Sequence, residues 1–349
     1  AKGHKVYVLY SKYPQEQFDL DLPYQVLWVR HHDFALLNFN ILSYSKALRP
    51  LVKKERFDVI HGNAEEAYWI GQIARENNSA YVFTSHTPNI PTTGMIKGII
   101  NPIRFFKSIN TYLLRKSILE GDIVVAYSQF SRNLILKGFA DPGCNTVKVV
   151  PPGVESSWFD VERKLSTGAR LLFWGRLEDE KGLPELFIAL KEVTKKIKQI
   201  KLILVGEGSQ LKEYKNLVVS LGLTEHVEFK GWLDAREIQN LTTQSDLGLF
   251  PSRIESFGLS VIEAMAAGLP VIAANGGAVP ENIKDGVTGT LIPVHDSNAL
   301  AKAIISALEN PKYIRNLAET AKKQVREKFS WDKTADSMID IYTSVLRDS

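Results

Sequence analysis

The sequence predicts an α/β protein built from two Rossmann-like domains. Short β-branched strands alternate with amphipathic helices almost throughout, which is typical of parallel sheets with helices on both faces. The chain has 349 residues, about twice the size of a common domain. The strands form two series of about six, separated by Pro151–Ser166, where Pro-Pro-Gly leads into a polar run.

The first half predicts one such domain over residues 1–155. Its strands are expected at Val6–Tyr10, Gln25–Arg30, Val59–His61, Tyr81–Ser85, Ile123–Tyr127 and Val147–Val150. The second strand begins about 15 residues after the first ends, which is tight for a parallel crossover with a full helix. We therefore expect a shortened first crossover.

The second half predicts a second domain over residues 156–330. Its strands are expected at Arg170–Trp174, Lys201–Val205, Val227–Lys230, Leu247–Phe250, Val271–Ala274 and Thr290–Ile292. Helical periodicity marks Leu183–Lys195, Gln210–Ser220 and Ala299–Leu308. Residues 331–349 read as a C-terminal helix, which we expect to pack back toward the N-terminal domain.

The composition excludes several classes of protein. A hydrophobic fraction of 44% and a charged fraction of 23% are those of a globular chain, and a net charge of +4 is too small for a nucleic-acid binder. Cys144 is the only cysteine, so an internal disulfide is impossible and a reducing compartment fits. Since the N-terminus lacks the pattern of a signal peptide, we expect a cytoplasmic protein.

Two strand-to-helix loops concentrate the unusual residues. Gly175–Gly182 follows one strand and carries Arg176 and Lys181 between its end glycines. The guanidinium of Arg176 can donate two parallel hydrogen bonds and the ammonium of Lys181 is a compact charge, so together they suit a diphosphate. The alternative is a solvated turn in which Glu178, Asp179 and Glu180 pair with these cations.

The second loop, Pro251–Gly258, opens a helix that ends near Gly268. Glu255 and Glu263 lie eight residues apart, one in the loop and one after the first helical turn. The amides at the helix start are free donors for hydroxyls or phosphate. An ordinary helix cap with Glu263 in water is the alternative, but the apolar run Leu259–Ala267 makes a partly buried Glu263 the better interpretation.

In this order and spacing, the motifs resemble the retaining nucleotide-sugar glycosyltransferases of the GT-B fold, glycosyltransferase family four (glycosyl transferases group 1). The resemblance covers most of residues 120–346. It is carried by the ordered set Val149–Val154, Gly175–Gly182, Val205–Gly208, Phe229–Leu233, Glu255–Glu263, Gly276–Glu281 and Asp285–Gly289. It implies two facing Rossmann-like domains with a donor and acceptor cleft between them.

The resemblance also implies roles for single residues. Arg176 and Lys181 would bind the donor diphosphate, Glu255 would face the donor sugar, and Glu263 would accept from the ribose hydroxyls. His86 matches the histidine that the family places near the anomeric carbon, although a lone histidine at a strand end is more often structural. The other donor-binding positions are Gly175, Ser256, Phe257, Gly258 and Leu259, with Gly231, Trp232 and Leu233 as the base-binding stretch.

The activity implied is a retaining, metal-independent hexosyl transfer from a nucleotide-sugar such as a UDP- or GDP-hexose. No cofactor is needed, because two basic side chains neutralise the leaving diphosphate. Two rivals stay open: an inactive scaffold subunit of the same fold, and a nucleotide-sugar epimerase. The loop Ser11–Gln17 departs from the family because it has no glycine, which weakly favours the first rival.

Two sets of candidate metal ligands are set aside. Asp19 and Asp21 have the spacing used by metal-dependent transferases of another fold, but they fall in an irregular stretch far from the diphosphate motifs. His31 and His32 are adjacent rather than three or four residues apart. We therefore expect no metal.

The segment 94–119 bears on the acceptor. It mixes many apolar and aromatic residues with Lys97, Arg104, Lys107, Arg115 and Lys116, and has no acidic residue. Such a helix can lie on an anionic membrane, or it can pack on the domain core with its cations in water. The first alternative implies a lipid-linked acceptor, and the second a soluble sugar or glycan.

Overall fold

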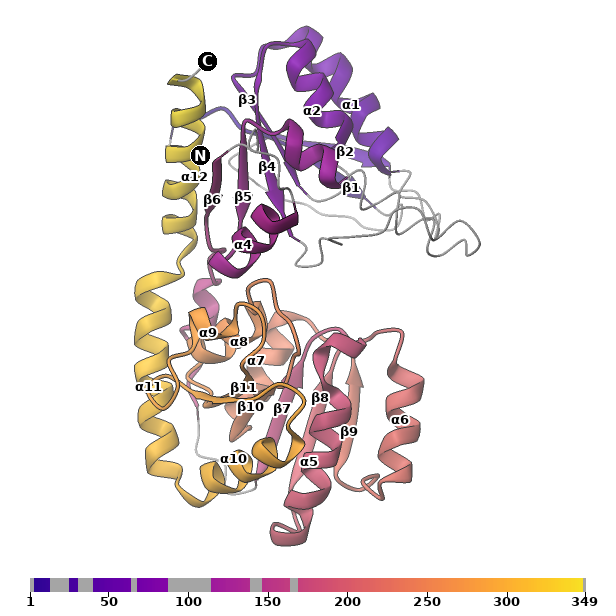
Figure 1. The fold of residues 1–349 in the computed structure, drawn as a ribbon, viewed down its shortest axis with the longest axis vertical. Coiled ribbons are helices and arrows are strands. Elements are labelled where there is room, and N and C mark those ends of the chain that lie inside the picture. Colours follow the sequence, from indigo (N-terminus) through magenta and orange to yellow (C-terminus); the bar gives the residue numbers. More distant parts are fainter. Residues whose placement is uncertain are drawn as a thin grey trace. The chain divides into compact units, whose positions relative to one another are not determined.

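The computed structural model describes residues 3–12, 25–30, 40–63, 68–86, 114–138, 146–163 and 169–347. The chain divides into two compact units (Figure 1). One comprises residues 1–127, 132–150 and 337–349, and the other comprises residues 128–131 and 151–336.

The first unit holds two parallel sheets. A two-stranded sheet pairs β1 (Tyr7–Lys12) with β2 (Gln25–Arg30) in parallel. The other sheet has the order β3-β4-β5-β6, with strands at Val59–Asn63, Ala80–Ser85, Ile123–Ala126 and Thr146–Val149. Its helices include α1 (Asn40–Lys54), α2 (Tyr68–Glu76) and all but the first turn of α4 (Gln129–Gly138). The connection between β1 and β2, where we predict a shortened crossover, lies outside the described residues.

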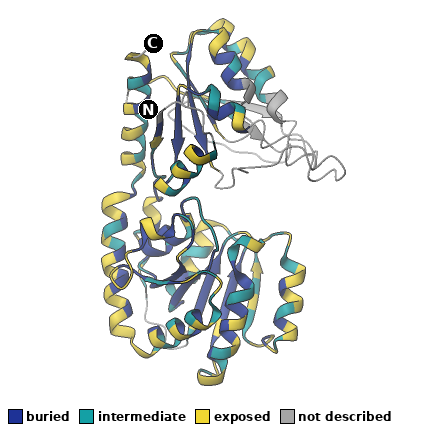
Figure 2. Cartoon of the chain, in the orientation of Figure 1, coloured by how far each residue is buried: buried dark blue, intermediate teal, exposed yellow. Residues whose placement is uncertain are grey.

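Both faces of the four-stranded sheet are buried (Figure 2). On one face Tyr81, Phe83 and Val124 pack against Ile73 and Ile118. The other face is covered by α12 (Trp331–Arg347), whose Ile341 and Val345 pack against side chains that include Val82, Val125 and Val150. The second half of the C-terminal helix therefore belongs to the core of the first unit.

A buried histidine joins α12 to this sheet. His61 Nδ1 lies 2.7 Å from the Tyr342 hydroxyl on α12, and His61 Nε2 lies 2.7 Å from Thr84 Oγ1. Burial lowers the pKa of His61 to about 4, with a further contribution from nearby His86. The ring is therefore neutral at pH 7, and it serves as a hydrogen-bond bridge between two strands and the helix.

The second unit is built on a six-stranded parallel sheet of order β12-β11-β10-β7-β8-β9. The strands are β7 (Arg170–Trp174), β8 (Lys201–Val205), β9 (Val227–Gly231), β10 (Leu247–Phe250), β11 (Val271–Ala274) and β12 (Thr290–Ile292). All six predicted strands are confirmed, five of them with identical bounds. Four of them (β7, β8, β10 and β11) are almost wholly buried, which explains why they read as continuous apolar runs.

Helices flank this sheet. On one side α5 (Leu183–Lys196) packs against α6 (Leu211–Ser220) and α10 (Ser297–Glu309), while α8 (Leu259–Ala266) packs against α11 (Pro311–Lys328). The same unit contains the shorter α7 (Ala235–Thr243) and α9 (Val279–Asn282). α7 begins with a full capping box in which Asp234 and Glu237 exchange hydrogen bonds.

Of the basic segment 94–119, residues 94–113 lie outside the described residues. Residues 114–120 are helical, and Leu114 and Ile118 are buried in the core of the first unit. This short helical stretch therefore packs against the core. Among the described residues, no helix is both long enough and apolar enough to span a membrane.

Candidate active site

The carboxyl ends of β7 and β10 lie side by side at the centre of the second sheet. Chain order runs outward from β7 through β8 to β9 on one side, and from β10 through β11 to β12 on the other. The order reverses between β7 and β10, and open parallel sheets bind ligands at such a point, just beyond the strand ends. The two loops singled out in the sequence, Gly175–Gly182 and Pro251–Gly258, follow these two strands.

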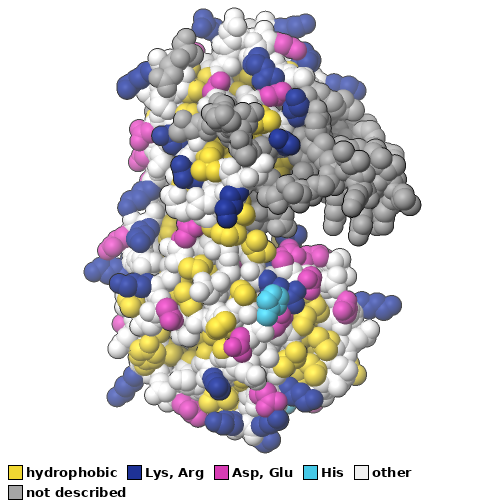
Figure 3. Space-filling model, in the orientation of Figure 1, with side chains coloured by type: hydrophobic (Ala, Val, Ile, Leu, Met, Phe, Trp, Pro, Cys, Tyr) yellow, Lys and Arg dark blue, Asp and Glu magenta, His cyan; other side chains and the backbone are white. Residues whose placement is uncertain are grey.

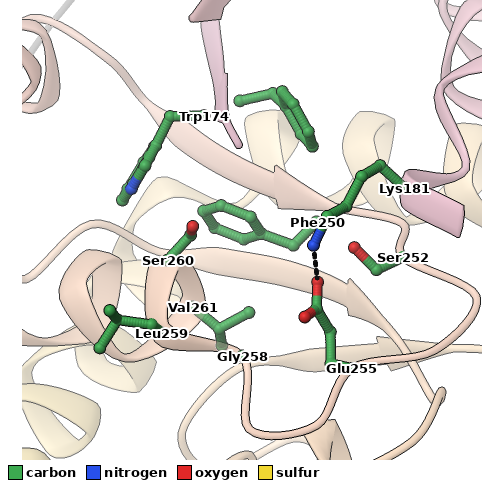
Figure 4. Close-up of a pocket in the computed structure, with 10 residues that line it drawn as sticks. Trp174, Lys181, Phe250, Ser252, Glu255, Gly258, Leu259, Ser260 and Val261 are labelled. Carbon is green, nitrogen blue, oxygen red and sulfur yellow. Dashed lines mark hydrogen bonds and ion pairs between the residues drawn. The ribbon is translucent and has the colours of Figure 1, made fainter. Parts of the chain in front are cut away.

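A pocket of about 130 Å³ opens between these loops and the start of α8 (Figure 4). Its lining mixes aromatic rings with a few polar groups, as small-molecule sites commonly do. The lining residues are Phe173, Trp174, Lys181, Phe250, Ser252, Glu255, Gly258, Leu259, Ser260 and Val261.

An ion pair lies across the pocket. Lys181 Nζ is 2.7 Å from Glu255 Oε1, and the two side chains are only 15% and 18% exposed. The ammonium comes from the loop after β7 and the carboxylate from the loop after β10, and the dashed line in Figure 4 marks their contact. A cation and an anion are therefore held within one pocket, where shielding from water strengthens the field of each.

Backbone contacts hold the two loops together. Gly182 adopts a left-handed conformation with φ of 67°, and a Cβ atom there would lie 2.1 Å from the carbonyl oxygen of Pro251. The amide of Arg253 donates to the carbonyl of Glu180 at 2.8 Å. Only glycine permits this approach at position 182, so the glycine next to Lys181 brings the cation toward Glu255.

A set of charged side chains supports the loops from outside the pocket, and sequence reasoning missed it. Arg253 forms ion pairs with Glu185 at 2.9 Å and with Asp179 at 2.7 Å, and His295 Nδ1 lies 2.8 Å from Glu185. These contacts join residues 68 to 110 positions apart, so no local pattern indicates them. They tie the loops after β7 and β10 to the first turn of α5.

Glu263 lies on α8, beside the pocket. Its Oε2 accepts a hydrogen bond of 2.9 Å from the indole Nε1 of Trp174. Burial raises the pKa of Glu263 to about 7, and the Trp174 hydrogen bond opposes this rise. The sequence predicted the partial burial of Glu263 but not its partner.

Arg176 is placed differently from Lys181. Its side chain is 72% exposed and pairs with Glu180 at 2.9 Å, and it does not line the pocket. The exposed pair costs little to break. The guanidinium can therefore leave Glu180 for an anionic ligand by rotation of its own side chain.

The remaining predicted donor contacts surround these groups. Gly258 caps α8 in a left-handed conformation with φ of 88°, Leu259 is 46% exposed at the pocket wall, and Phe257 is buried against Phe329. The carbonyl of Ser256 accepts hydrogen bonds from two serine hydroxyls in the stretch 128–131 that groups with this unit.

The predicted base-binding stretch follows β9, at the edge of the sheet. Trp232 is 71% exposed and does not line the pocket. The carbonyl of Gly231 accepts a hydrogen bond from the amide of Gly206. Gly206 also packs closely on Gly175, since a Cβ atom added to Gly206 would lie 1.9 Å from the carbonyl oxygen of Gly175. The loop after β8 therefore contacts both the loop after β7, at the pocket, and the end of β9, next to Trp232.

His86 belongs to the first unit, where it follows β4 and is exposed. Its Nε2 lies 3.3 Å from Asn63 Oδ1 at the end of β3, and its ring meets that of Tyr127 edge-on at 5.0 Å. Three polar side chains therefore gather at the carboxyl ends of β3, β4 and β5. Sequence reasoning singled out His86 alone.

The candidate metal ligands Asp19, Asp21, His31 and His32 all lie outside the described residues. Within the described ranges, no group of three or more His, Cys, Asp and Glu side chains is arranged to hold a metal ion.

Comparison with known proteins decides the family. The profile of "Glycosyl transferases group 1" matches residues 155–324, and that of "Glycosyltransferase Family 4" matches residues 1–158. The chain belongs to the family-four glycosyltransferases of the GT-B fold. The predicted α/β class and GT-B fold are confirmed by the parallel sheets and by the match to solved GT-B structures.

Two curated relatives of this glycosyltransferase indicate the range of the family. Glycogen synthase of Mycobacterium tuberculosis (strain H37Rv) is 29% identical over 73% of this chain, and the alignment spans 60% of the relative's own length. Phosphatidyl-myo-inositol mannosyltransferase of Mycobacterium leprae is 28% identical over 99% of this chain and 89% of its own.

Solved structures show the same fold. Sucrose-phosphate synthase from Thermosynechococcus elongatus matches with a TM-score of 0.83 at 22% identity, covering 100% of this glycosyltransferase and 90% of its own chain. HepE from Anabaena, solved in complex with UDP-glucose, matches with a TM-score of 0.73 at 21% identity over 92% and 86% of the two chains.

Proposed function

We propose that this glycosyltransferase moves a hexosyl group from a nucleotide-sugar to a hydroxyl acceptor with retention of configuration and without a metal ion. The observation that carries the proposal is the Lys181–Glu255 pair, held across a pocket at the strand-order reversal of the second unit. The UDP-glucose complex of HepE supports a nucleotide-sugar donor. No cofactor is required.

Each step of the transfer has a group to stabilise it. The bond between the anomeric carbon and the diphosphate oxygen breaks, and its electron pair goes to the diphosphate, where Lys181 and Arg176 offset the new charge. Positive charge develops on the sugar ring, and the carboxylate of Glu255 faces it. The acceptor oxygen bonds to the same carbon, and its proton passes to a donor phosphate oxygen on the same face.

The other roles in the proposal rest on the resemblance. Glu263 accepts from the ribose hydroxyls, the amides of Phe257, Gly258 and Leu259 line the donor, and Gly231, Trp232 and Leu233 meet the base. His86 is proposed to act near the anomeric carbon. Its exposure and its contacts with Asn63 and Tyr127 are compatible with a side chain oriented for a ligand.

Turnover in excess chelator tests the metal-independent, retaining reaction. We expect transfer from a UDP- or GDP-hexose to continue in about 10 mM EDTA, because side chains rather than a cation neutralise the diphosphate. The product should have the anomeric configuration of the donor by NMR. Strict dependence on a divalent ion, or an inverted product, would contradict the proposal. A product formed without any acceptor would instead indicate an epimerase.

For the acceptor, we propose a sugar or a lipid-linked sugar. On the face shown in Figure 3, cations and acids are interspersed over the described surface, without a large patch of one sign. The sequence feature that favours a contact with an anionic membrane is the basic segment 94–119. Its five cations should each contribute about 1 kcal/mol near anionic lipid.

Vesicle co-sedimentation at two salt concentrations tests this contact. We expect binding to anionic vesicles to exceed binding to neutral ones and to weaken with salt. Replacing Lys97, Arg104 and Lys107 with Glu should abolish it and leave nucleotide-sugar binding unchanged. Equal and salt-insensitive recovery on both lipids, or none, would favour a soluble acceptor.

A further inference from the structure

Trp174 makes a polar contact that the proposed roles do not use. It is the last residue of β7, directly before Gly175, and its side chain lines the pocket with Lys181 and Glu255 (Figure 4). Only 5% of the residue is exposed, and its indole Nε1 donates to Glu263 Oε2 at 2.9 Å. A buried indole needs such an acceptor, since Trp has one donor and no acceptor of its own.

Aromatic neighbours hold the indole in this orientation. The ring of Trp158 stacks on it with a centroid separation of 5.8 Å and an angle of 7°, and the ring of Phe250 meets it edge-on at 4.9 Å and 83°. The donor hydrogen is thus aimed at Glu263 by packing alone, before any ligand binds. Fixing a group in advance reduces the entropy that binding must otherwise remove.

Glu263 has two carboxylate oxygens, and the structure distinguishes them. Oε2 accepts from Trp174, whereas Oε1 accepts no hydrogen bond from any residue in the described ranges. The charged groups on the surrounding elements, Lys181 and Glu255 at the pocket and Lys322 on α11, form neither an ion pair nor a hydrogen bond with Glu263. Oε1 is therefore the oxygen that remains for a ligand.

We propose that Trp174 is a positioning residue for the donor nucleoside: its indole holds Glu263 so that Oε1 is directed at a ribose hydroxyl. This inference rests on the proposed function, in which Glu263 accepts from the ribose. It adds a determinant of ribose recognition outside the two loops that carry the family motifs, at the end of the strand that precedes the first of them.

The protonation of Glu263 gives the inference a separate readout. An ionised carboxylate accepts hydrogen bonds at both oxygens, and burial raises the pKa of Glu263 to about 7. The Trp174 hydrogen bond stabilises the charged form and lowers this pKa. Donor affinity should therefore rise with pH through about 7, and loss of the indole N–H should move that rise to higher pH.

Calorimetric titration of Trp174→Phe, from pH 5.5 to 8.5, tests the inference. The ligands are UDP-glucose and GDP-glucose, because their esterified diphosphates do not titrate in this pH range. The nucleotide-sugar that binds the wild type better is also tested in its 2′-deoxyribose and 3′-deoxyribose forms. We expect Trp174→Phe to weaken binding about tenfold at pH 7, because hydrogen bonds to charged groups are among the stronger ones. The pH midpoint should rise by about one unit, and the preference for ribose over deoxyribose should shrink.

Two further variants make the result specific. Trp158→Phe keeps an aromatic ring against Trp174 and removes no hydrogen bond to Glu263, so the pH midpoint of donor binding should stay at its wild-type value. If Trp174→Phe fails to fold, the benzothiophene analogue of Trp at position 174 keeps the ring shape and lacks only the N–H. The inference would be overturned if Trp174→Phe, or the benzothiophene analogue in its place, left both the pH midpoint of donor binding and the preference for ribose over deoxyribose unchanged.

Glu263→Gln separates this failure from failure of the proposed function. If Glu263→Gln abolishes the ribose preference while Trp174→Phe does not alter it, the function stands and the role of Trp174 is wrong. If Glu263→Gln retains the full ribose preference, or if neither nucleotide-sugar binds the wild type, the proposed donor site is wrong and the inference falls with it.

Discussion

Replacing Lys181 with Ala or Met should reduce turnover about 100-fold or more, as expected when a charge contact to a leaving group is lost in a shielded site. Lys181 Nζ lies in the pocket, 15% exposed, and its only ion-pair partner among the described residues is Glu255. Met keeps most of the aliphatic stem, so Lys181→Met removes the charge and little of the packing. Steady-state kinetics with a saturating nucleotide-sugar measure the effect.

Lys195→Ala is the matched control, because Lys195 lies on the same unit and pairs with Glu192 on the surface of α5, where it is 64% exposed. It should retain wild-type turnover. Arg176→Ala should also fall about 100-fold if the exposed guanidinium moves from Glu180 to the diphosphate. Near-normal turnover in folded Lys181→Met would show that the diphosphate lies elsewhere.

Gly182→Ala should impair both stability and turnover. The new Cβ atom would lie 2.1 Å from the carbonyl oxygen of Pro251, at a φ of 67° that L-residues rarely adopt. The left-handed conformation alone costs about 1–2 kcal/mol, and relief of the clash requires the loops after β7 and β10 to separate. We expect a total loss of about 3 kcal/mol or more in the free energy of unfolding, together with a fall in turnover as Lys181 moves away from Glu255.

The chain offers a matched control for the strain. Gly222 has a φ of 73°, and a Cβ atom there would meet nothing within 4 Å. Gly222→Ala should therefore lose about 1 kcal/mol and keep its turnover. Urea unfolding of both variants, with kinetics on each, makes the comparison. Equal stability losses and equal turnover would show that the approach of the two loops is not what Gly182 provides.

The strand positions could be predicted because burial on both faces leaves short continuous apolar runs between helices. In the second unit this rule accounts for β7, β8, β10 and β11, and the loops after β7 and β10 stood out because glycines, cations and carboxylates interrupt the apolar pattern. The order of the strands was not available from that pattern. It decides which loops meet, and it is what brings Lys181 to Glu255 across 74 positions of chain.

The contacts that support the pocket were not predicted either, because they too join residues far apart in the chain. Trp174 reads as one more apolar residue at a strand end, and its hydrogen bond to Glu263 spans 89 positions. A signal did exist, since a Trp that is buried beside a glycine loop must find an acceptor for its N–H. The Arg253–Glu185–His295 set had no such signal, because each member alone is a common surface residue.

We propose that the pocket between the loops after β7 and β10 binds the donor diphosphate. A crystal structure of the protein with UDP-glucose, or with a GDP-hexose if that binds more tightly, tests it most directly. We predict a phosphate oxygen within hydrogen-bond distance of Lys181 Nζ and a ribose hydroxyl on Glu263. A nucleotide bound outside this pocket, with Lys181 still paired to Glu255 and no phosphate near it, would show that the donor diphosphate binds elsewhere.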